Sequence, residues 1–577
     1  FVFISEEVFS SNKALWFSPS GTKLAFGYFN DSNTPIMNIP FYGYPGSLSF
    51  QYTSAIPIHY PKSGTTNPTV KLYYVNLEDV IRDNFTLMEI EYPRQLSSVE
   101  RILTAVAFPT DNIVSATWMN RVQNQAYFHL CNVSTLNCTT ALSYVESDGW
   151  VEQFDAPHFS KDGTAFLLIL PQSQGEDGDW RHLVLVTNAT SGSPSTIALT
   201  SGTFVVTEII SWDEDSNYVY YLATTKDDPA VQHLYRVSTL DSNYTSECLS
   251  CNIKSNTDDT YCLYNSAKFS TDNSYYILTC SGPGVPDISI YNRNSTKLFT
   301  WENNHDVANL VSGKSLPKVQ RYTVSVMDGF EAQVRLLLPP NADLSGSTKY
   351  PMLVYVYGGP DSYQVTEKFN MDWGTYLVTN KSIIYAAIDG RGSGLKGNNM
   401  LFAGYRNLGT VEIIDQINVT RHLQENFPYI DSTRTAIWGW SYGGYAAGMT
   451  LAMDYNGVFK CGMSVAPVTD WALYDSIYTE RFMGLPTVDD NLVGYEQGQL
   501  LNKVDNIKTK SYYLIHGTLD DNVHYQQSLM LAKVLEQKDI LFRQQTYTDE
   551  DHGIAQSRAH LYHSLENFLD ECFDTPS

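Results

Sequence analysis

The first half of the chain is built from short runs in which hydrophobic and polar residues alternate. These runs are rich in Tyr, Phe, Val and Ile, and turn-forming clusters such as residues 18–21 and 160–163 separate them. Alternation with a period of two residues is typical of antiparallel β-strands. The clearest candidate strands cover residues 23–29, 70–75, 165–170, 218–222 and 275–279.

A loose repeat links several of these strands. An aromatic residue, a Ser-containing turn and a hydrophobic strand follow one another at residues 17–26, 159–166 and 269–278. Repeated four-stranded units of about 40–50 residues are typical of β-propeller blades. We therefore predict that residues 1–315 form an all-β propeller, of about six or seven blades at that unit size, with a β-sandwich as the alternative.

The pattern changes its period near residue 315. Apolar strands now alternate with segments of helical period, which predicts a parallel sheet covered by helices on both faces. Residues 316–577 are therefore predicted to form an α/β domain that follows the propeller. Candidate strands cover residues 352–357, 383–388, 435–439, 462–465 and 512–515, and candidate helices cover residues 410–424, 445–454, 526–536 and 559–571.

The α/β domain carries a nucleophile motif. The sequence Gly439-Trp-Ser441-Tyr-Gly443 follows a predicted strand and opens a predicted helix. The two glycines allow a tight strand-to-helix turn that leaves the Ser hydroxyl exposed. Because a Ser hydroxyl is a weak nucleophile, it needs a general base and a group that orients the base.

Two residues further along the chain suit these roles. Asp520 follows the end of another strand, and His552 lies on a loop before the last helix. The order Ser, Asp, His is that of α/β-hydrolases. We expect Ser441 to attack, His552 to take and return the proton, and Asp520 to orient the imidazole and stabilise its charged form.

Three nearby residues are alternatives for the base and its partner. Asp521 competes with the preceding carboxylate, and His516 and His524 are rival histidines. Neither rival histidine lies on the loop after the last strand, which favours His552.

The charge of the chain narrows the possible partners. There are 62 acidic and 37 basic residues, which gives a net charge of −25, and no Lys/Arg-rich run offsets it. Nucleic-acid binding is therefore not expected, and the charge favours solubility. No apolar run approaches the roughly 18–20 residues needed to span a bilayer. The chain starts Phe-Val-Phe-Ile without Met and soon turns acidic, so we expect a mature protein, or a piece of one, that contains neither signal peptide nor membrane anchor.

Cysteines and glycosylation sequons together indicate the secretory pathway. The simplest disulfide framework pairs Cys131 with Cys138, Cys248 with Cys251 and Cys262 with Cys280, and leaves Cys461 and Cys572 for the C-terminal part, although other connectivities stay open. The alternative that Cys248 and Cys251 form half of a zinc site lacks a second ligand pair nearby, so we expect no metal. The candidate glycosylation sites are Asn30, Asn84, Asn132, Asn137, Asn188, Asn243, Asn294, Asn380 and Asn418.

Longer segments extend this picture over nearly the whole chain. They cover residues 14–21, 60–64, 437–445, 457–462, 465–468, 478–486 and 547–554. In these segments the chain closely resembles the family of dipeptidyl peptidase IV and fibroblast activation protein. The resemblance implies a cofactor-free serine exopeptidase, secreted or exposed at the cell surface, that releases N-terminal dipeptides X-Pro or, less well, X-Ala. It also implies a homodimer formed through residues 41–61 and the C-terminal helix.

The resemblance assigns further roles by position. Glu6 and Glu7 match the acidic pair that binds the substrate's α-ammonium group, and two carboxylates can pair with one cation through charge-assisted bonds. The hydroxyl of Tyr357 and the backbone N–H of Tyr442 match the oxyanion site. The remaining matches are the proline pocket (Tyr442, Val468, Trp471, Tyr474 and Tyr478), a contact to the substrate carbonyl (Asn522), an aromatic of the extended binding site (Phe154) and an acid that favours dipeptide release (Asp475).

The chain also departs from the family pattern. Asp155 stands where the family has Arg, and Asp361 replaces a Cys. No residue matches the family's upstream substrate-binding Arg, so we expect the chain to begin part-way through an N-terminally incomplete propeller. Two alternative functions stay open: an inactive binding or receptor homologue, and a prolyl endopeptidase or acyl-peptide esterase.

Overall fold

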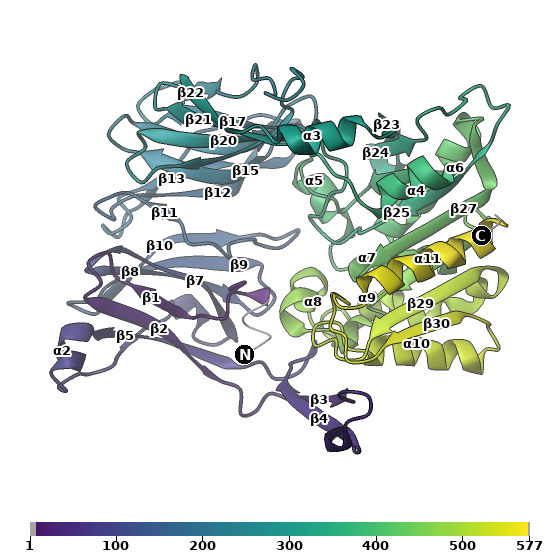
Figure 1. Ribbon diagram of the computed structural model, residues 1–577. Coiled ribbons are helices and arrows are strands. Elements are labelled where there is room, and N and C mark those ends of the chain that lie inside the picture. Colours follow the sequence, from purple (N-terminus) through teal and green to yellow (C-terminus); the bar gives the residue numbers. More distant parts are fainter. Residues whose placement is uncertain (1–6, 575–577) are drawn as a thin grey trace.

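The protein, a computed structural model that describes residues 7–574, has two parts (Figure 1). One part is a stack of small sheets, and the other is a large sheet with helices on both faces. The last strand of the stack ends at Glu302, and the first strand of the large sheet begins at Lys318. We propose residue 315, which lies between them, as the boundary.

The stack consists of five four-stranded blades. Each blade is an antiparallel meander, and the fourth and fifth blades are joined by a single parallel pair between Gln232 and Tyr264. The strands are β1 (Leu15–Phe17), β2 (Lys23–Asn30), β5 (Thr69–Asn76) and β6 (Met88–Ile90) in blade one; β7 (Arg101–Thr110), β8 (Ile113–Asn120), β9 (Gln125–Asn132) and β10 (Asn137–Val145) in blade two; β11 (His158–Phe159), β12 (Phe166–Ser173), β13 (Asp179–Thr187) and β14 (Ser195–Ala198) in blade three; β15 (Val206–Asp213), β16 (Tyr218–Thr224), β17 (Gln232–Ser238) and β18 (Ser246–Cys248) in blade four; and β19 (Tyr264–Phe269), β20 (Tyr275–Gly282), β21 (Asp287–Asn292) and β22 (Lys297–Glu302) in blade five.

The predicted count of six or seven blades is wrong for residues 7–574. Part of the chain that the count assigned to blades forms a separate arm instead. The arm consists of β3 (Ile36–Phe41) and β4 (Ser54–His59), which pair only with each other and project from the body below blade one (Figure 1).

The repeat in the sequence has a local structural cause. It marks the first hairpin of blades one, three and five. In blade three the Ser160 N–H donates to the carbonyl of Ala165 at 2.9 Å, and the Ser160 hydroxyl donates to Asp162 at 2.7 Å. Ser270 makes the same two bonds in blade five, at 2.9 and 2.7 Å. A Ser–Asp pair therefore closes each of these two turns from within.

Buried apolar side chains fill the space between successive blades. Phe128 of blade two stacks on Phe166 of blade three, with ring centroids 6.1 Å apart. Tyr220 and Tyr221, adjacent on β16, lie in different clusters: Tyr221 packs toward blade three and Tyr220 toward blade five. Successive strand side chains point to opposite faces, so each strand of a blade contributes to both neighbouring interfaces.

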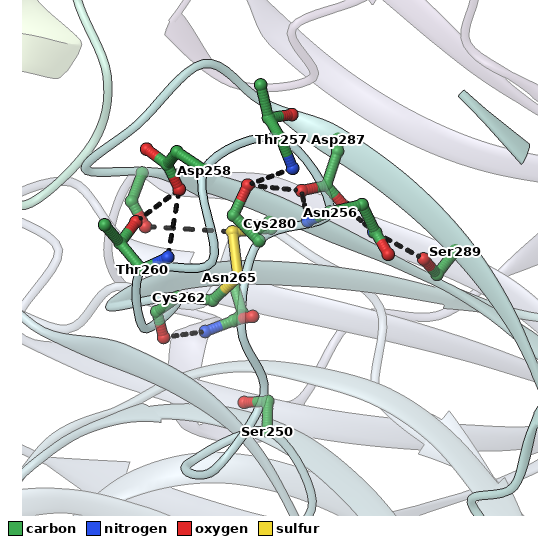
Figure 2. The surroundings of a disulfide bond; sticks show 12 residues. Ser250, Asn256, Thr257, Asp258, Thr260, Cys262, Asn265, Cys280, Asp287 and Ser289 are labelled. Atoms are coloured by element: carbon green, nitrogen blue, oxygen red, sulfur yellow. Dashed lines mark hydrogen bonds between the residues drawn. A yellow bond between two sulfur atoms is a disulfide. The ribbon is translucent and has the colours of Figure 1, made fainter. Parts of the chain in front are cut away.

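Disulfides fasten individual elements. The structure forms Cys131–Cys138, Cys248–Cys251, Cys262–Cys280 and Cys461–Cys572. Figure 2 shows how Cys262–Cys280 ties the loop before β19 to β20. The buried carboxylate of Asp287 holds the same loop by accepting hydrogen bonds from the Ser255 hydroxyl and the Asn256 N–H, each at 2.8 Å.

The large sheet has eight strands, of which the last six in spatial order are parallel. Their order is β23 (Lys318–Ser325), β24 (Glu331–Leu338), β26 (Ile384–Asp389), β25 (Tyr350–Tyr355), β27 (Ile430–Trp440), β28 (Cys461–Val465), β29 (Ser511–Gly517) and β30 (Arg543–Tyr547). This is the arrangement of an α/β-hydrolase domain behind a β-propeller, in agreement with the predicted fold class.

Helices cover both faces of the large sheet (Figure 1). One face buries apolar side chains of α4 (Trp373–Lys381) and α11 (Arg558–Phe573), and the other buries those of α6 (Val411–Asn426), α7 (Tyr442–Met453) and α10 (Gln526–Gln537). The remaining helices are α2 (Leu77–Ile81), α3 (His305–Ser312), α5 (Asn398–Leu401), α8 (Ser476–Met483) and α9 (Leu492–Gly498). Within residues 7–574, every helix is too short or too polar to cross a membrane.

Charged side chains join the two parts. Arg121, between β8 and β9, donates from Nε and Nη2 to the two carboxylate oxygens of Glu480 on α8, at 2.6 and 2.7 Å. The Glu480 side chain is fully buried, and the Gly64 N–H also donates to it at 2.7 Å. A buried carboxylate needs such partners, because an unpaired one is costly.

Replacing Arg121 with Met should therefore destabilise the whole chain. The change leaves the Glu480 carboxylate buried without its cation, a loss of about 3–5 kcal/mol for pairs of this kind. We expect a lower midpoint in thermal and urea unfolding. The double variant Arg121→Met/Glu480→Gln should recover part of the loss, and a single variant as stable as the parent would contradict this role of the pair.

Candidate active site

Ser441 lies at a sharp turn between β27 and α7. Its backbone has φ 62° and ψ −122°, a conformation that non-glycine residues rarely adopt. The turn is possible because Gly439 and Gly443, two positions before and after Ser441, lack side chains. A Cβ on Gly439 would lie 2.3 Å from the carbonyl oxygen of Gly443, and a Cβ on Gly443 would lie 2.2 Å from that of Val356.

These contacts explain one error in the helix prediction. α7 begins at Tyr442, three residues before the predicted start at residue 445. Gly443 and Gly444 disfavour a helix by propensity, but both are required by close packing against neighbouring backbone. Tertiary contact thus overrides local preference here.

Asp520 and His552 form a tight pair. His552 Nδ1 lies 2.6 Å from Asp520 Oδ2, while the other carboxylate oxygen accepts the N–H groups of Asn522 at 3.1 Å and Val523 at 2.9 Å. Burial alone would raise the pKa of Asp520, but His552 and His516 together lower it to about 2. Asp520 is therefore ionised at neutral pH and can fix the imidazole of His552.

The three residues predicted as a triad stand beyond the carboxyl ends of β27, β29 and β30. A further bond joins two of these loops, since Trp440 Nε1 donates to the carbonyl of His552 at 3.0 Å. Trp440 directly precedes Ser441, so this bond fixes the histidine loop against the nucleophile turn. In parallel α/β sheets, sites form at this edge.

The residues considered as alternatives for the base and its partner lie elsewhere in the structure. The imidazole of His552 contacts the carboxylate of Asp520. His516 is fully buried, and its Nε2 lies 3.0 Å from Asp520 Oδ2 and 2.7 Å from the carbonyl of Val523. No motif predicted this second histidine contact, which joins His516 on β29 to Asp520 on the loop that follows the strand. His524 is also buried, and burial lowers its pKa to about 4.

Two tyrosines proposed for an oxyanion site lie beside Ser441. The rings of Tyr357 and Tyr442 are 6.2 Å apart. The Tyr442 hydroxyl donates to the buried carboxylate of Glu412 at 2.8 Å, and Tyr442 is the first residue of α7. Tyr357 is half-buried, and burial together with Glu7 raises its pKa, so its hydroxyl stays protonated and can donate.

An aromatic cluster, which contains the residues predicted to form the proline pocket, adjoins these tyrosines. The rings of Trp471 and Tyr478 are parallel within 11° and 6.1 Å apart, and Tyr474 meets Tyr478 edge to face at 5.4 Å. Val468 is buried in the same cluster. The Tyr474 hydroxyl donates to Asn522 Oδ1 at 2.6 Å, which links the pocket to the Asp520 loop.

Glu7 lies within electrostatic range of this pocket. Its carboxylate raises the pKa of Tyr357, Tyr474 and Tyr478, in each case in addition to burial. It also raises the pKa of Asp475, which is buried and whose Oδ1 accepts the Tyr478 N–H at 2.9 Å. Glu6, the other predicted member of the acidic pair, lies outside the described residues.

Phe154 borders the same region from the propeller. It packs against Val8 and Ile477, and the Arg481 guanidinium lies 4.3 Å above its ring. Arg481 Nε is held by Gln123 at 2.8 Å. Asp155, which follows Phe154, is exposed.

Two groups of residues in the described part of the chain have the spacing of metal ligands. They are His129 with Cys131 and Cys138, and His233 with Cys248 and Cys251. Each pair of cysteines forms a disulfide, so neither offers the thiolates that zinc requires.

Comparison with known proteins covers both structural parts. The description "Dipeptidyl peptidase IV (DPP IV) N-terminal region" matches residues 2–287, and "Prolyl oligopeptidase family" matches residues 369–576. "Venom dipeptidyl peptidase 4" from Vespa velutina is 43% identical over 568 residues, which are 98% of this chain and 72% of that protein. "Prolyl endopeptidase FAP" from Bos taurus is 34% identical over 578 residues, which are 98% of this chain and 73% of that protein.

A solved structure agrees with these matches. The crystal structure of Porphyromonas gingivalis dipeptidyl peptidase 4 superposes with a TM-score of 0.85 at 28% identity, over 99% of this chain and 76% of that one. Because the superposition covers 99% of this chain, it includes both the propeller and the hydrolase sheet. The chain therefore belongs to the dipeptidyl peptidase IV family, among the prolyl oligopeptidase-type serine peptidases.

Proposed function

We propose that the chain removes dipeptides from the amino end of peptides, with Pro or Ala as the second residue. The observation that carries this proposal is the buried Asp520–His552 pair beside the Ser441 turn, within reach of an aromatic pocket and of Glu7. The Asp520–His552 pair activates Ser441, and Glu7 and the aromatic pocket bind the substrate.

The reaction follows from the roles of these groups. Ser441 attacks the carbonyl carbon of the second residue while His552 takes the hydroxyl proton, and Asp520 stabilises the resulting imidazolium. The Tyr442 N–H and the Tyr357 hydroxyl bind the negative oxygen of the tetrahedral intermediate. His552 then gives its proton to the leaving amine, which releases the rest of the peptide and leaves an acyl-enzyme. Water, activated by His552, hydrolyses the ester and frees the dipeptide.

Recognition requires a small ring and a free amine. The pocket formed by Val468, Trp471, Tyr474 and Tyr478 is flat and aromatic, which suits a pyrrolidine ring and excludes long side chains. Glu6 and Glu7 would pair with the α-ammonium group, and Asn522 with a substrate carbonyl. The spacing between these carboxylates and Ser441 would then fit two residues, so that cleavage follows the second residue of the substrate.

The key test compares Gly-Pro substrates that carry a chromogenic leaving group and either a free or a blocked amino end. Only the free-amine substrate should be turned over, because a blocked amine cannot pair with Glu7. Glu7→Gln should raise KM at least about tenfold for the free-amine substrate, since a hydrogen bond between charged groups contributes about 1.5–3 kcal/mol.

The alternatives predict different outcomes in the same assay. Equal turnover of both substrates would favour a prolyl endopeptidase or acyl-peptide esterase, the activity named in the bovine relative. No turnover of either, by folded protein, would favour an inactive binding homologue. An unchanged KM in Glu7→Gln would exclude ammonium binding by that residue.

The catalytic pair can be tested by Asp520→Asn. The amide keeps the shape but favours the wrong imidazole tautomer, so kcat should fall by about 10³–10⁴-fold. Because the pKa of Asp520 is about 2, below its ordinary value of 3.8, the stability that it contributes is present above about pH 4 and is lost as pH falls toward 2. The acid limb of a kcat profile between pH 5 and 8 should therefore report on His552. A fall in kcat of less than tenfold in Asp520→Asn would argue against the pair.

An extracellular environment is the setting we propose. It rests on the four disulfides and the sequons, of which Asn30, Asn84, Asn132, Asn137, Asn188, Asn243, Asn294 and Asn380 are exposed. Asn418 is half-buried on α6, and Thr420 of its sequon is fully buried, which disfavours glycosylation there.

A homodimer is the assembly we propose, with the arm as part of the contact. The arm loop exposes Tyr44, Leu48 and Tyr52, with 74%, 87% and 84% of their surfaces accessible. Exposed apolar groups gathered on one projecting element are typical of an interaction surface.

The double variant Tyr44→Ser/Leu48→Ser should shift the protein toward monomer in sedimentation-velocity experiments. Leu240→Ser is the matched control, because Leu240 is 75% exposed but lies between β17 and β18 of blade four, outside both the arm and the C-terminal helix. Parent protein that sediments as a monomer, or an equal effect of the control, would contradict the proposed contact.

A further inference from the structure

Arg181 and Asp361 join the propeller to the loop that carries Tyr357. Arg181 lies on β13 of blade three, and Asp361 follows Tyr357 by four positions. Arg181 donates from Nη1 to Asp361 Oδ2 at 2.9 Å and from Nη2 to Asp361 Oδ1. Their side chains are only 23% and 20% exposed. A two-pronged Arg–carboxylate pair fixes orientation as well as distance.

The backbone at Asp361 is also fixed. Its φ is 61°, in the left-handed region, where Asp and Asn are tolerated better than most residues. Its N–H donates to the carbonyl of Gly392 at 3.0 Å. A Cβ on Gly394 would lie 2.4 Å from Asp361 Oδ1, so the facing loop leaves room for the carboxylate only because residue 394 is Gly. The Asp361 side chain is thus confined to the side that faces Arg181.

Between Tyr357 and Asp361 the loop turns back on itself, and the Ser362 N–H donates to the carbonyl of Gly359 at 3.0 Å. The loop contains Gly358, with φ 77°, and Gly359. On the other side of Tyr357, the Val356 N–H donates to the carbonyl of Trp438 in β27 at 3.0 Å. The sheet therefore anchors one end of the Tyr357 segment, and the propeller anchors the other.

We infer that Arg181 is a positioning residue that places the Tyr357 hydroxyl for oxyanion binding by clamping Asp361, an inference that rests on the proposed function. Oxyanion stabilisation requires a donor at the right place before the charge forms, and small displacements are costly. The clamp would make the propeller a structural part of the catalytic site.

Glu152 extends the clamp toward the substrate region. Its Oε2 lies 3.7 Å from Arg181 Nη1, and its Oε1 accepts the Trp150 Nε1–H at 2.6 Å. Burial and the adjacent Asp361 raise the pKa of Glu152 to about 7. Glu152 is therefore partly protonated near neutral pH, and Asp361 is the main carboxylate partner of Arg181. Phe154 and Asp361 line one cavity of about 350 Å³, so the clamp lies at the wall of the region proposed to bind substrate.

The test compares Arg181→Met, Arg181→Lys and Asp361→Asn with the parent in the free-amine dipeptide assay. Asn keeps the tolerance for a left-handed backbone but loses the charge. We expect kcat to fall about 10- to 100-fold in Arg181→Met and Asp361→Asn, with KM changed less than about threefold, and an intermediate kcat in Arg181→Lys. The Arg181→Met/Asp361→Asn double variant should be no slower than the slower single variant, because both changes remove one interaction.

Inhibitor binding separates positioning from general damage. A dipeptide boronate, which forms a tetrahedral adduct with Ser441, should bind the clamp variants more weakly in proportion to their loss of kcat/KM. An aminoacyl-pyrrolidide, which lacks the carbonyl group that would enter the oxyanion site, should bind them as it binds the parent. The matched control is Arg321→Met, which breaks another two-pronged pair between the parts, with Asp228 at 2.8 and 2.6 Å, and an ion pair with Glu367 at 2.7 Å, but touches none of residues 357–361 through these bonds.

The outcomes distinguish the two proposals. An active parent with unchanged kcat in the clamp variants, an equal fall in Arg321→Met, or equal weakening of boronate and pyrrolidide would overturn the clamp but leave the proposed function intact. An inactive parent would overturn the proposed function and the clamp with it. Unfolding midpoints measured on every variant would show whether a fall in kcat merely follows loss of folded protein.

Discussion

The buried contact between propeller and hydrolase domain is the constraint on which the site depends. The carboxyl edge of the large sheet carries Ser441, Asp520 and His552, and the groups proposed to recognise substrate come partly from the other part of the molecule. Charges at this contact cannot be left unpaired without a large cost. Arg121 with Glu480, and Arg321 with Asp228, meet that requirement in two places along the boundary. Their geometry sets how far the propeller lies from the nucleophile.

Chemistry and recognition are divided between the parts. The hydrolase domain contains all three residues of the proposed Ser–His–Asp arrangement and the aromatic residues of the proposed proline pocket. The propeller contributes Glu7 and Phe154, and the segment after the arm reaches into the pocket. In that segment the Ser63 N–H donates to the carbonyl of Tyr474 at 3.0 Å, and the Tyr60 hydroxyl donates to the carbonyl of Asn522 at 2.8 Å. The division explains how a general acyl-transfer site can be restricted to short peptide ends without changes to its reacting groups.

The sequence predicted the parts that depend on local patterns. The strand period, the Ser–Asp turns of the blades and the Gly-x-Ser-x-Gly turn are all short-range signals, and they led to the correct fold class. The blade count failed because β3 and β4 have the pattern of strands but pair outside any blade. Asp520 could be chosen over Asp521 by motif, but the second partner of its carboxylate, His516, could not. Likewise Arg181 and Asp361 are 180 residues apart, and nothing in either local sequence indicates their contact.

The approach of two backbones at Gly282 limits how the molecule can move. A Cβ at this position would lie 1.9 Å from the carbonyl oxygen of Glu367, and beside it the Phe369 N–H donates to the carbonyl of Ser281 at 2.8 Å. Blade five and the segment after the Tyr357 loop are therefore in main-chain contact with no side chain between them. A hinge at this point would have to break backbone hydrogen bonds rather than slide side chains. We therefore expect blade five to move as one unit with the segment after the Tyr357 loop, so that any relative motion of the two parts would have to be taken up at the other blades.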